Sequence, residues 1–365
     1  MTMNYTLCLP SYSVGPDCYK DIPAAAGRLG KTAVAVGGKT ALEKAKEAML
    51  AGVAGSDVTI TDFIWYGGNC NTENIARLEA DPRVRAADLV FAVGGGRAVD
   101  TCKVFADHLG KPVFSFPTIA SNCAGCTAIS VVYNPDDSLH GYYYPKTPPV
   151  HTFIHTGIIA GAPEEFLWAG IGDALSKECE VKLATRGLDL PHTPLMGQAL
   201  AGCCTKPLVE FGAQALADCR AGVPSRALQE VALDIIISTG LVSNMTTHET
   251  EYYYNSSIAH AVYNGSTVVP ACVRGHRHGE VVAFGVLVLL TYDGQLKERA
   301  RLMAFNKSIG LPVTMAGAGL SLADLPALAD KASTVTEWTC TPYPMNKEKL
   351  IQAIVDCDKA GRAMA

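Results

Sequence analysis

The feature that most constrains the fold is an alternation, from about Leu29 to Phe153, of short β-branched runs with stretches of helical character. Two of these runs, Thr32–Val36 and Leu89–Val93, end in glycines and lead into segments with helical periodicity. This alternation is typical of a parallel sheet flanked by helices. We expect further strands at Val58–Trp65 and Pro112–Phe116, helices at Thr40–Leu50 and Ala98–Leu109, and a hairpin formed by Ile129–Tyr133 and Gly141–Tyr144.

The character of the chain changes after Ala162-Pro163, where helical periodicity replaces the alternation. With 365 residues, two domains are the default. We therefore predict an α/β dinucleotide-binding domain over residues 1–162 and an all-α metal- and substrate-binding domain over residues 163–365, with a cleft between them. The expected helices of the second half are Glu164–Thr185, Pro194–Arg220, Ala227–Met245, Ser257–Tyr263, Leu287–Ile309 and Lys347–Ala360.

Composition excludes several classes of function. The chain is 48% hydrophobic and 18% charged, with a formal net charge of −5, and its basic residues are scattered, so neither nucleic acid nor a membrane is an expected partner. Its first residues lack the basic start and apolar run of a secretory signal, and no apolar stretch is long enough to span a bilayer. The 13 cysteines have no disulfide-scaffold spacing. We expect a cytoplasmic homo-oligomer that acts on a small molecule and keeps its thiols reduced.

Three consecutive glycines, Gly94, Gly95 and Gly96, stand where a predicted strand ends and a helix begins. Backbone N–H groups at such a turn can approach a pyrophosphate, whose charge the helix dipole favours. A plain tight turn explains a glycine triplet equally well, and the spacing is not that of the ordinary Rossmann fingerprint. Downstream, Lys103 can face a phosphate or, as is more usual for lysine, solvent.

An acid and several histidines in apolar surroundings are candidate metal ligands. Asp173 begins a long apolar stretch, and His260 and His278 lie in two others. Each taken alone is explained by a helix N-terminus or by a hydrogen-bonded core histidine. Together, two imidazoles and a carboxylate suit Zn²⁺, Fe²⁺ or Mn²⁺ and leave a coordination position open for substrate. His276 is an alternative ligand or a proton-relay group.

Four blocks of the chain, in this order, resemble the iron-containing (group III) alcohol dehydrogenases, especially the glycerol dehydrogenase branch. The resemblance covers most of the chain and implies the dehydroquinate synthase-like fold, with the α/β and all-α domains described above. It also implies that Asp173, His260 and His278 bind the metal. The four blocks are Gly94–Asp100, Gly172–Lys177, Ala259–Gly265 and His278–Gly285.

The resemblance further implies a set of cofactor-binding residues for NAD(H) or NADP(H). Gly95, Gly96 and Arg97 match the pyrophosphate loop of the family. The complete set that we expect is Gly94, Gly95, Gly96, Arg97, Asp100, Thr118, Ser121, Thr127, Ile129 and Tyr133, together with Gly38 and Lys39.

Two departures from the family pattern bear on specificity. Glycerol dehydrogenases have an aspartate, which helps to bind the polyol, where this chain has Cys123. This loop is closer to the hydroxycarboxylate dehydrogenases of the family, which reduce 2-oxo acids, and the loss of a negative charge favours an anionic substrate. The second departure is at Gly38 and Lys39, where NAD-preferring relatives often carry an acid near the adenosine ribose. We therefore expect NADP(H) to be accepted.

The expected function is metal-dependent hydride transfer between NAD(P)(H) and a small alcohol or carbonyl compound, with a 2-hydroxy or 2-oxo acid as a serious candidate. The catalytic residues would be Asp173, His260 and His278, with His276 or a water chain delivering the proton and Cys123 contacting the substrate. Three alternatives remain open: a glycerol dehydrogenase, a lyase or phosphate-substrate enzyme of the same fold, and a nucleotide-binding protein without catalytic activity.

Overall fold

The computed structural model describes residues 6–136 and 139–364, which form two compact units. The first consists of the described residues of Met1–Glu164 together with Ala217–Asn244, and the second of Glu165–Leu216 together with those of Met245–Ala365. The predicted boundary after residue 162 lies close to the first change of unit. Residues 217–244, however, join the first unit rather than the helical second half.

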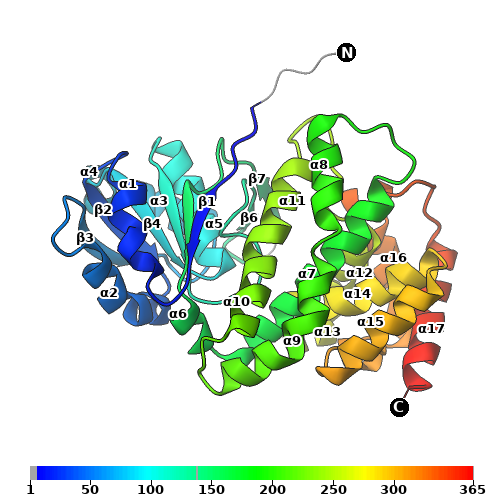
Figure 1. The fold of residues 1–365 in the computed structure, drawn as a ribbon. Coiled ribbons are helices and arrows are strands. Elements are labelled where there is room, and N and C mark those ends of the chain that lie inside the picture. Colours follow the sequence, from blue (N-terminus) through cyan, green and yellow to red (C-terminus); the bar gives the residue numbers. More distant parts are fainter. Residues whose placement is uncertain (1–5, 137–138, 365) are drawn as a thin grey trace. The chain divides into compact units, whose positions relative to one another are not determined.

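The first unit contains a parallel six-stranded sheet in the order β1-β8-β5-β4-β2-β3 (Figure 1). The strands predicted from β-branched runs are confirmed as β2, β3, β4 and β5, whereas β1 and β8 were not foreseen. A short hairpin of β6 and β7 confirms the predicted excursion. The strands are β1 (Ser11–Val14), β2 (Thr32–Gly37), β3 (Thr59–Trp65), β4 (Leu89–Gly94), β5 (Val113–Pro117), β6 (Ser130–Tyr133), β7 (Leu139–Tyr143) and β8 (His151–Ile154).

Helices cover both faces of this sheet, which explains why its central strands are almost wholly apolar. Alternate residues of β2 enter opposite cores: Ala33 and Ala35 pack with α1 and α2, and Val34 and Val36 pack with α3, α4 and α5. The helical segments of Met1–Glu164 are η1 (Cys18–Asp21), α1 (Ile22–Ala26), α2 (Lys39–Val53), α3 (Thr72–Ala80), α4 (Pro82–Ala86), α5 (Gly96–His108) and α6 (Thr156–Ala160).

The remaining chain is helical apart from its connections. The segment predicted as one helix over Ala227–Met245 is continuous but contains a π-helical turn, η2. It consists of α10 (Arg226–Leu233), η2 (Asp234–Ser238) and α11 (Thr239–Thr246). The other helices are α7 (Glu164–Ala184), α8 (His192–Ala201), α9 (Thr205–Arg220), α12 (Ile258–Ser266), α13 (Pro270–Gly275), α14 (His278–Tyr292), α15 (Leu296–Ser308), α16 (Leu325–Ala332) and α17 (Lys347–Arg362), with short 3-10 turns η3 (Ala316–Ala318), η4 (Leu322–Asp324) and η5 (Thr336–Thr339).

Two predicted helices are wrong in their extent. The stretch Pro194–Arg220 is divided into α8 and α9 by a turn at Gly202. The stretch Leu287–Ile309 is the end of α14 followed by α15, because Gly294 adopts a left-handed φ of 73° between them. In both cases the apolar pattern continues across the break, so periodicity alone does not reveal it.

Helix α14 lies at the centre of the second unit and is buried along most of its length. Helix α7 meets it backbone to backbone: a Cβ on Gly172 would lie 2.4 Å from the carbonyl oxygen of Gly279, and a Cβ on Gly279 would lie 1.9 Å from that of Ala169. Helix α12 meets α14 similarly, since a Cβ on Gly285 would lie 2.5 Å from the oxygen of Ala259. These glycines allow the three helices to approach closely.

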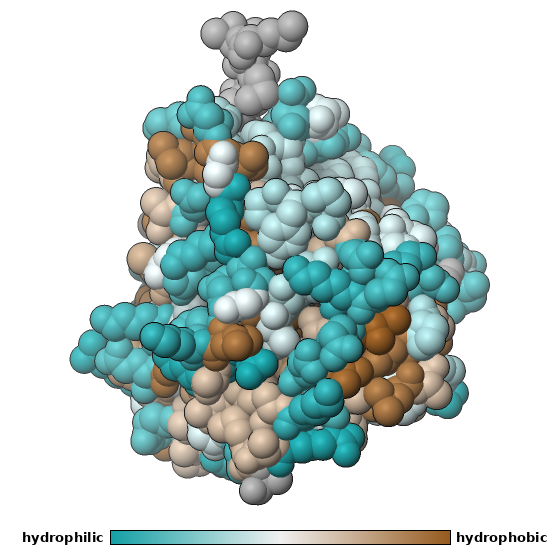
Figure 2. Space-filling view, turned by 90° about the vertical axis from the view of Figure 1, so that its right-hand side faces the viewer, coloured by the Kyte–Doolittle hydropathy of each residue, from teal (hydrophilic) through white to brown (hydrophobic). Residues whose placement is uncertain are grey.

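The face of the molecule drawn in Figure 2 carries hydrophobic residues in small separate groups among hydrophilic side chains. Among the described residues, no helix is both long enough and apolar enough to span a membrane.

Candidate metal centre and cofactor site

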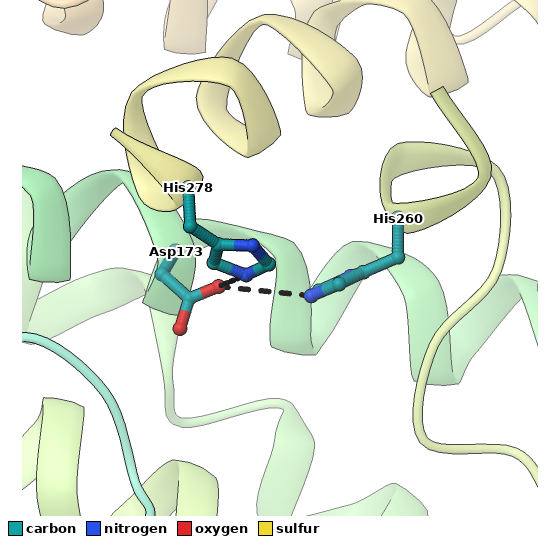
Figure 3. A group of neighbouring side chains, drawn as sticks. All are labelled: Asp173, His260 and His278. Atoms are coloured by element: carbon teal, nitrogen blue, oxygen red, sulfur yellow. Dashed lines mark hydrogen bonds and ion pairs between the residues drawn. The ribbon is translucent and has the colours of Figure 1, made fainter. Parts of the chain in front are cut away.

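Helices α7, α12 and α14 bring Asp173, His260 and His278 together in the second unit (Figure 3). The Oδ1 atom of Asp173 lies 3.0 Å from Nε2 of His278 and 3.6 Å from Nε2 of His260. One ligand atom from each residue lies within 4.8 Å of the others. Asp173 follows Gly172 and His278 precedes Gly279, so the glycine contacts between α7 and α14 are what place these two side chains side by side.

The charges of this group are strongly coupled. Burial disfavours the ionised form of Asp173, but attraction and hydrogen bonds from the two imidazoles outweigh it and hold the pKa of the carboxyl well below its usual range. Burial likewise disfavours the imidazolium of His260, but the charge of Glu180 and hydrogen bonds to Asp173 and Glu180 raise its pKa to about 10. Without a metal ion, therefore, His260 holds a proton at neutral pH.

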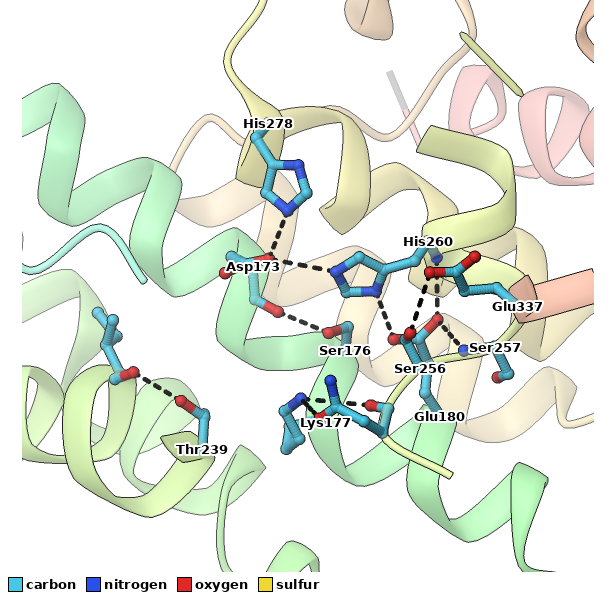
Figure 4. Close-up of polar contacts among 12 residues, drawn as sticks. Asp173, Ser176, Lys177, Glu180, Thr239, Ser256, Ser257, His260, His278 and Glu337 are labelled. Atoms are coloured by element: carbon cyan, nitrogen blue, oxygen red, sulfur yellow. Dashed lines mark hydrogen bonds and ion pairs between the residues drawn. The ribbon is translucent and has the colours of Figure 1, made fainter. Parts of the chain in front are cut away.

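A second carboxylate, Glu180, orients His260 and was missed by sequence reasoning. It is fully buried, and its Oε2 lies 2.6 Å from Nδ1 of His260 (Figure 4). Its Oε1 accepts hydrogen bonds from the backbone N–H of Ser257 at 2.8 Å and of His260 at 2.9 Å. Nε2 is thereby left to face Asp173, as in other carboxylate–histidine–metal arrangements. The available signal was its position seven residues after Asp173, two turns along one helix face.

The donor set fits a divalent metal ion. Two imidazole nitrogens and a carboxylate oxygen converge from three helices, and the carboxylate of Glu180 holds one of the imidazoles in orientation. Zn²⁺, Fe²⁺ and Mn²⁺ all accept such ligands, and three protein donors leave a position for a substrate oxygen. The predicted ligand positions are thus close enough in space to act as one site.

His276 lies outside this group of three. Its Nδ1 is 2.7 Å from Oε1 of Glu280, and its ring packs against Gly319, where a Cβ would lie 2.5 Å from the ring. The structure therefore brings together His278, rather than the alternative His276, with Asp173 and His260. A role of His276 in proton delivery stays a prediction.

The predicted cofactor residues of the first unit gather at the carboxyl edge of its sheet. After β3 the chain returns to the other side of β2, so that β2 and β4 are neighbours and the strand order reverses between them. Ligands of open α/β sheets bind outside such a reversal point. Gly38 follows β2, Gly94 ends β4, and the N–H of Gly38 donates to the oxygen of Val93 at 3.3 Å, so the two glycine-containing turns are adjacent.

The glycine triplet is shaped as an open turn. Gly94 has a φ of 141°, which other residues rarely adopt, and α5 begins at Gly96 with its N-terminus at the sheet edge. A Cβ on Gly96 would lie 2.7 Å from the side chain of Asn122, which crowds this side of the turn. The helix N-terminus and the lack of side chains fit a pyrophosphate.

Several other predicted cofactor residues border this turn. The guanidinium of Arg97 lies over the ring of Tyr133 at 5.3 Å, and the ammonium of Lys39 lies over the ring of Trp65 at 4.6 Å. Thr118 follows β5, and its N–H is 3.4 Å from the oxygen of Gly94. Ser121 is half-buried in the same loop. Direct contact of these residues with a cofactor stays a prediction.

The expectation of a solvent- or phosphate-facing Lys103 is wrong. Its side chain is 1% exposed, and its ammonium forms an ion pair with Asp100 at 2.8 Å. The ammonium also donates to the carbonyl oxygens of Ala124, Thr127 and Ile129. Asp100, Thr127 and Ile129 were predicted to bind the cofactor; the structure shows that all three take part in this clamp on the loop after β5.

Cys123 lies half-buried in that loop, and Cys126 is fully buried beside it. The N–H of Cys126 donates to the oxygen of Cys123 at 2.9 Å, and neither cysteine forms a disulfide. Burial raises the pKa of Cys126 far above its usual range, so this thiol stays protonated. The expectation that the pair forms part of a wall, without redox chemistry, is consistent with this environment.

Comparison with known proteins identifies the family. The model of the iron-containing alcohol dehydrogenases matches residues 10–156. The glycerol dehydrogenase of Thermotoga maritima is 34% identical over 307 residues, which cover 81% of each chain. Hydroxycarboxylate dehydrogenase A of Escherichia coli is 34% identical over 254 residues, which cover 69% of this chain and 68% of its own.

Solved structures agree. A probable glycerol dehydrogenase from Sinorhizobium meliloti 1021 has a TM-score of 0.85 at 27% identity and covers 99% of this chain and 100% of its own. The chain is thus a metal-dependent dehydrogenase that uses NAD(H) and acts on a CH–OH group. It belongs to the iron-containing alcohol dehydrogenase family. The relatives named here are all dehydrogenases, which supports hydride transfer over the lyase, phosphate-substrate and non-catalytic alternatives.

Proposed function

We propose that this dehydrogenase interconverts small 2-hydroxy and 2-oxo carboxylic acids. The observation that carries the proposal is Cys123, a half-buried thiol at the position where the family resemblance puts the aspartate of glycerol dehydrogenases. A thiol in place of a carboxylate removes a negative charge that would repel an anionic substrate. The similarity to hydroxycarboxylate dehydrogenase A supports the same substrate class.

We propose that Asp173, His260 and His278 hold the metal ion and that Glu180 keeps the imidazole of His260 turned toward it. When bound there, a divalent ion supplies Lewis acidity that polarises the substrate oxygen during hydride transfer. We also propose that His276 transfers the proton. Its hydrogen bond with Glu280 supports this role, because an imidazole paired with a carboxylate can pass a proton to or from solvent.

The cofactor is proposed to bind at the reversal point of the sheet, with its pyrophosphate at Gly94–Gly96. Lys39 then lies beside Gly38 and is held over Trp65, where a cation would attract the 2′-phosphate of NADP(H). We therefore propose that NADPH is accepted as well as NADH. Comparison of kcat/KM for the two cofactors tests this, and a strong preference for NADH would count against Lys39 as a phosphate contact.

A substrate panel tests the proposed chemistry. The purified enzyme, loaded in turn with Zn²⁺, Fe²⁺ and Mn²⁺, is assayed with 2-oxo acids, simple aldehydes and polyols. We expect the highest kcat/KM for a 2-oxo acid. Turnover of glycerol above that of every 2-oxo acid would refute the proposal.

Polyol oxidation is the second candidate. It is supported by the glycerol dehydrogenase of Thermotoga maritima, whose similarity covers more of this chain than that of the hydroxycarboxylate enzyme. In this case a group other than Cys123 would have to bind the polyol in place of the aspartate of glycerol dehydrogenases. Cys123→Asp is then expected to raise the kcat/KM for glycerol, whereas under the main proposal it lowers that for 2-oxo acids.

We further propose that the protein is a cytoplasmic homo-oligomer. The 13 cysteines all lie among the described residues and none forms a disulfide, which suits a reducing compartment. Helix α8 exposes apolar side chains at Leu195, Met196 and Leu200, which supports burial of this surface in an assembly. Light scattering on the purified protein gives the oligomeric state directly, and a monomer would contradict that part of the proposal.

A further inference from the structure

Lys177 is a buried cation on the helix that carries the metal ligand Asp173. It lies one turn further along α7 and is only 6% exposed. Its ammonium donates to Oδ1 of Asn255 at 2.5 Å and to the carbonyl oxygen of Asn255 at 3.3 Å (Figure 4). Both partners are neutral oxygens. Of the three N–H donors that a lysine has, these contacts use two.

Comparison with Lys103 shows what Lys177 lacks. Lys103 is equally buried, but it has the carboxylate of Asp100 at 2.8 Å as a counter-charge. Among the described residues, no carboxylate lies within ion-pair distance of Lys177. A buried charge without a counter-charge is costly, so an anion bound beside it would be stabilising. Lys177 is therefore a candidate residue for binding an anionic ligand.

The neighbouring carboxylates on α7 do not fill this role. Asp173 is committed to His260 and His278, and Glu180 to His260 and two backbone N–H groups. A divalent ion would balance the charges of these two carboxylates. Glu337, a further buried carboxylate nearby, accepts hydrogen bonds from Ser256 and Tyr253 and forms no ion pair with Lys177. The carboxylate of a 2-oxo acid would give the ammonium of Lys177 a direct counter-charge.

We propose that Lys177 binds the carboxylate of the substrate and so selects acids over neutral carbonyl compounds of the same size. The proposal rests on the function proposed above, because it names the group that recognises the acid. Asn255 contributes by holding the ammonium in place with two hydrogen bonds, which leaves the third donor for the substrate.

The test compares Lys177→Gln and Lys177→Met with the wild-type enzyme. Glutamine keeps a donor for Asn255 without the charge, and methionine removes both; Lys177→Arg retains the charge. The control is Lys182→Met, because Lys182 lies on the same helix but is exposed and paired with Glu178.

Each variant is assayed with pyruvate and with hydroxyacetone, a neutral carbonyl compound of similar size. Zinc content and the binding of oxamate, a 2-oxo acid analogue that is not reduced, are measured on the same samples.

We expect the glutamine and methionine variants to lose about 10- to 100-fold in kcat/KM for pyruvate and a similar factor in oxamate affinity, as for a lost hydrogen bond to a charged group. Their kcat/KM for hydroxyacetone should stay within about threefold, since no charge is recognised there. Zinc content should be unchanged. Arginine should restore part of the activity on pyruvate, and Lys182→Met should match the wild type.

Equal losses on both substrates would overturn the proposal, because they would mean that Lys177 only holds the loop at Asn255. No loss on either substrate would overturn it as well. A wild-type enzyme that reduces pyruvate and other 2-oxo acids while Lys177→Gln shows no selective loss refutes this inference alone. A wild-type enzyme that reduces no 2-oxo acid refutes the proposed function. In that case, oxamate binding to the wild type that is lost in Lys177→Gln would still support an anion site at Lys177. A wild type that does not bind oxamate would overturn the anion site as well.

Discussion

The candidate metal centre of the second unit and the glycine turn of the first are built in opposite ways. The centre joins Asp173, His260 and His278, three side chains from three helices that are far apart in the sequence. The turn at Gly94–Gly96 is local in sequence and consists of backbone at the end of a strand. The first is therefore vulnerable to the removal of a side chain, whereas the second is vulnerable to the addition of one.

The largest effect is expected for Asp173→Ala, which removes the carboxylate on which both imidazoles converge. Metal binding and turnover should disappear together, with a loss in kcat of about 10³-fold or more, since the Lewis acid contributes several kcal/mol. Metal analysis and steady-state kinetics on one preparation measure both. His276→Ala is the matched control and should keep its metal content. Full activity of a metal-free Asp173→Ala protein would disprove the assignment.

Glu180→Gln should have the next largest effect, because it weakens the orientation of His260 without removing a ligand. Zinc affinity should fall about 10- to 100-fold, the usual cost of losing a carboxylate that orients a metal-binding histidine. Competition with a fluorescent chelator measures it. Glu178→Gln, on the same helix but paired with the exposed Lys182, should leave the affinity unchanged. Unchanged affinity in Glu180→Gln would show that the buried carboxylate is dispensable for the metal.

Gly94→Ala tests the other side of the comparison. Its φ of 141° is strained for alanine, at a cost of about 1–3 kcal/mol, and the added Cβ would lie 3.1 Å from Ala98. We expect KM for NADH to rise about tenfold while the zinc content stays the same. Gly110→Ala imposes a similar backbone strain at a φ of 65°, at the opposite end of α5, and serves as control. A loss of zinc in Gly94→Ala would contradict the independence of the two sites.

The smallest expected effect is the number of protons released when zinc binds. His260 has an ordinary pKa of 6.5, which its carboxylate partners raise to about 10, so the metal-free protein keeps this proton at pH 8. Zinc must displace it, so zinc affinity should rise with pH as long as the pH stays below about 10. Calorimetric titrations at pH 8 in buffers of different ionisation enthalpy should show the release of about one proton per zinc ion bound. Binding without proton release would mean that His260 is neutral before the metal arrives.

The same contrast governs how much can be predicted from the sequence. Strands β2, β4 and β5 are predictable because each is a short, mostly apolar run that ends in a glycine or proline. Strand β1 is not, because Ser11–Val14 carries little hydrophobic signal and is placed at the sheet edge only by its pairing with β8. The assignment of residues 217–244 to the first unit is not predictable either, since a helical sequence pattern does not indicate the unit in which the helix packs.

From the sequence alone, each candidate metal ligand could be recognised, but residue spacing could not show that the three belong to one site. Asp173 and His260 are far apart in the sequence, and only the resemblance to a family grouped them before the structure showed their proximity. Lys103 illustrates the converse failure: a lysine is usually exposed, and only the tertiary packing shows it buried against the loop after β5. Glu180 was detectable in principle, because it shares a helix face with Asp173.

The close approach of Gly172 and Gly279 bears on how such an enzyme can diversify. Helices α7 and α14 touch through main-chain atoms. The spacing of Asp173 and His278 is therefore set by backbone contacts rather than by the size of neighbouring side chains. Substitutions elsewhere can then reshape substrate selectivity while the reaction centre stays in place. New specificities in this architecture should therefore arise at the residues that we propose to contact the substrate, Cys123 and Lys177, while Gly172 and Gly279 accept no larger residue.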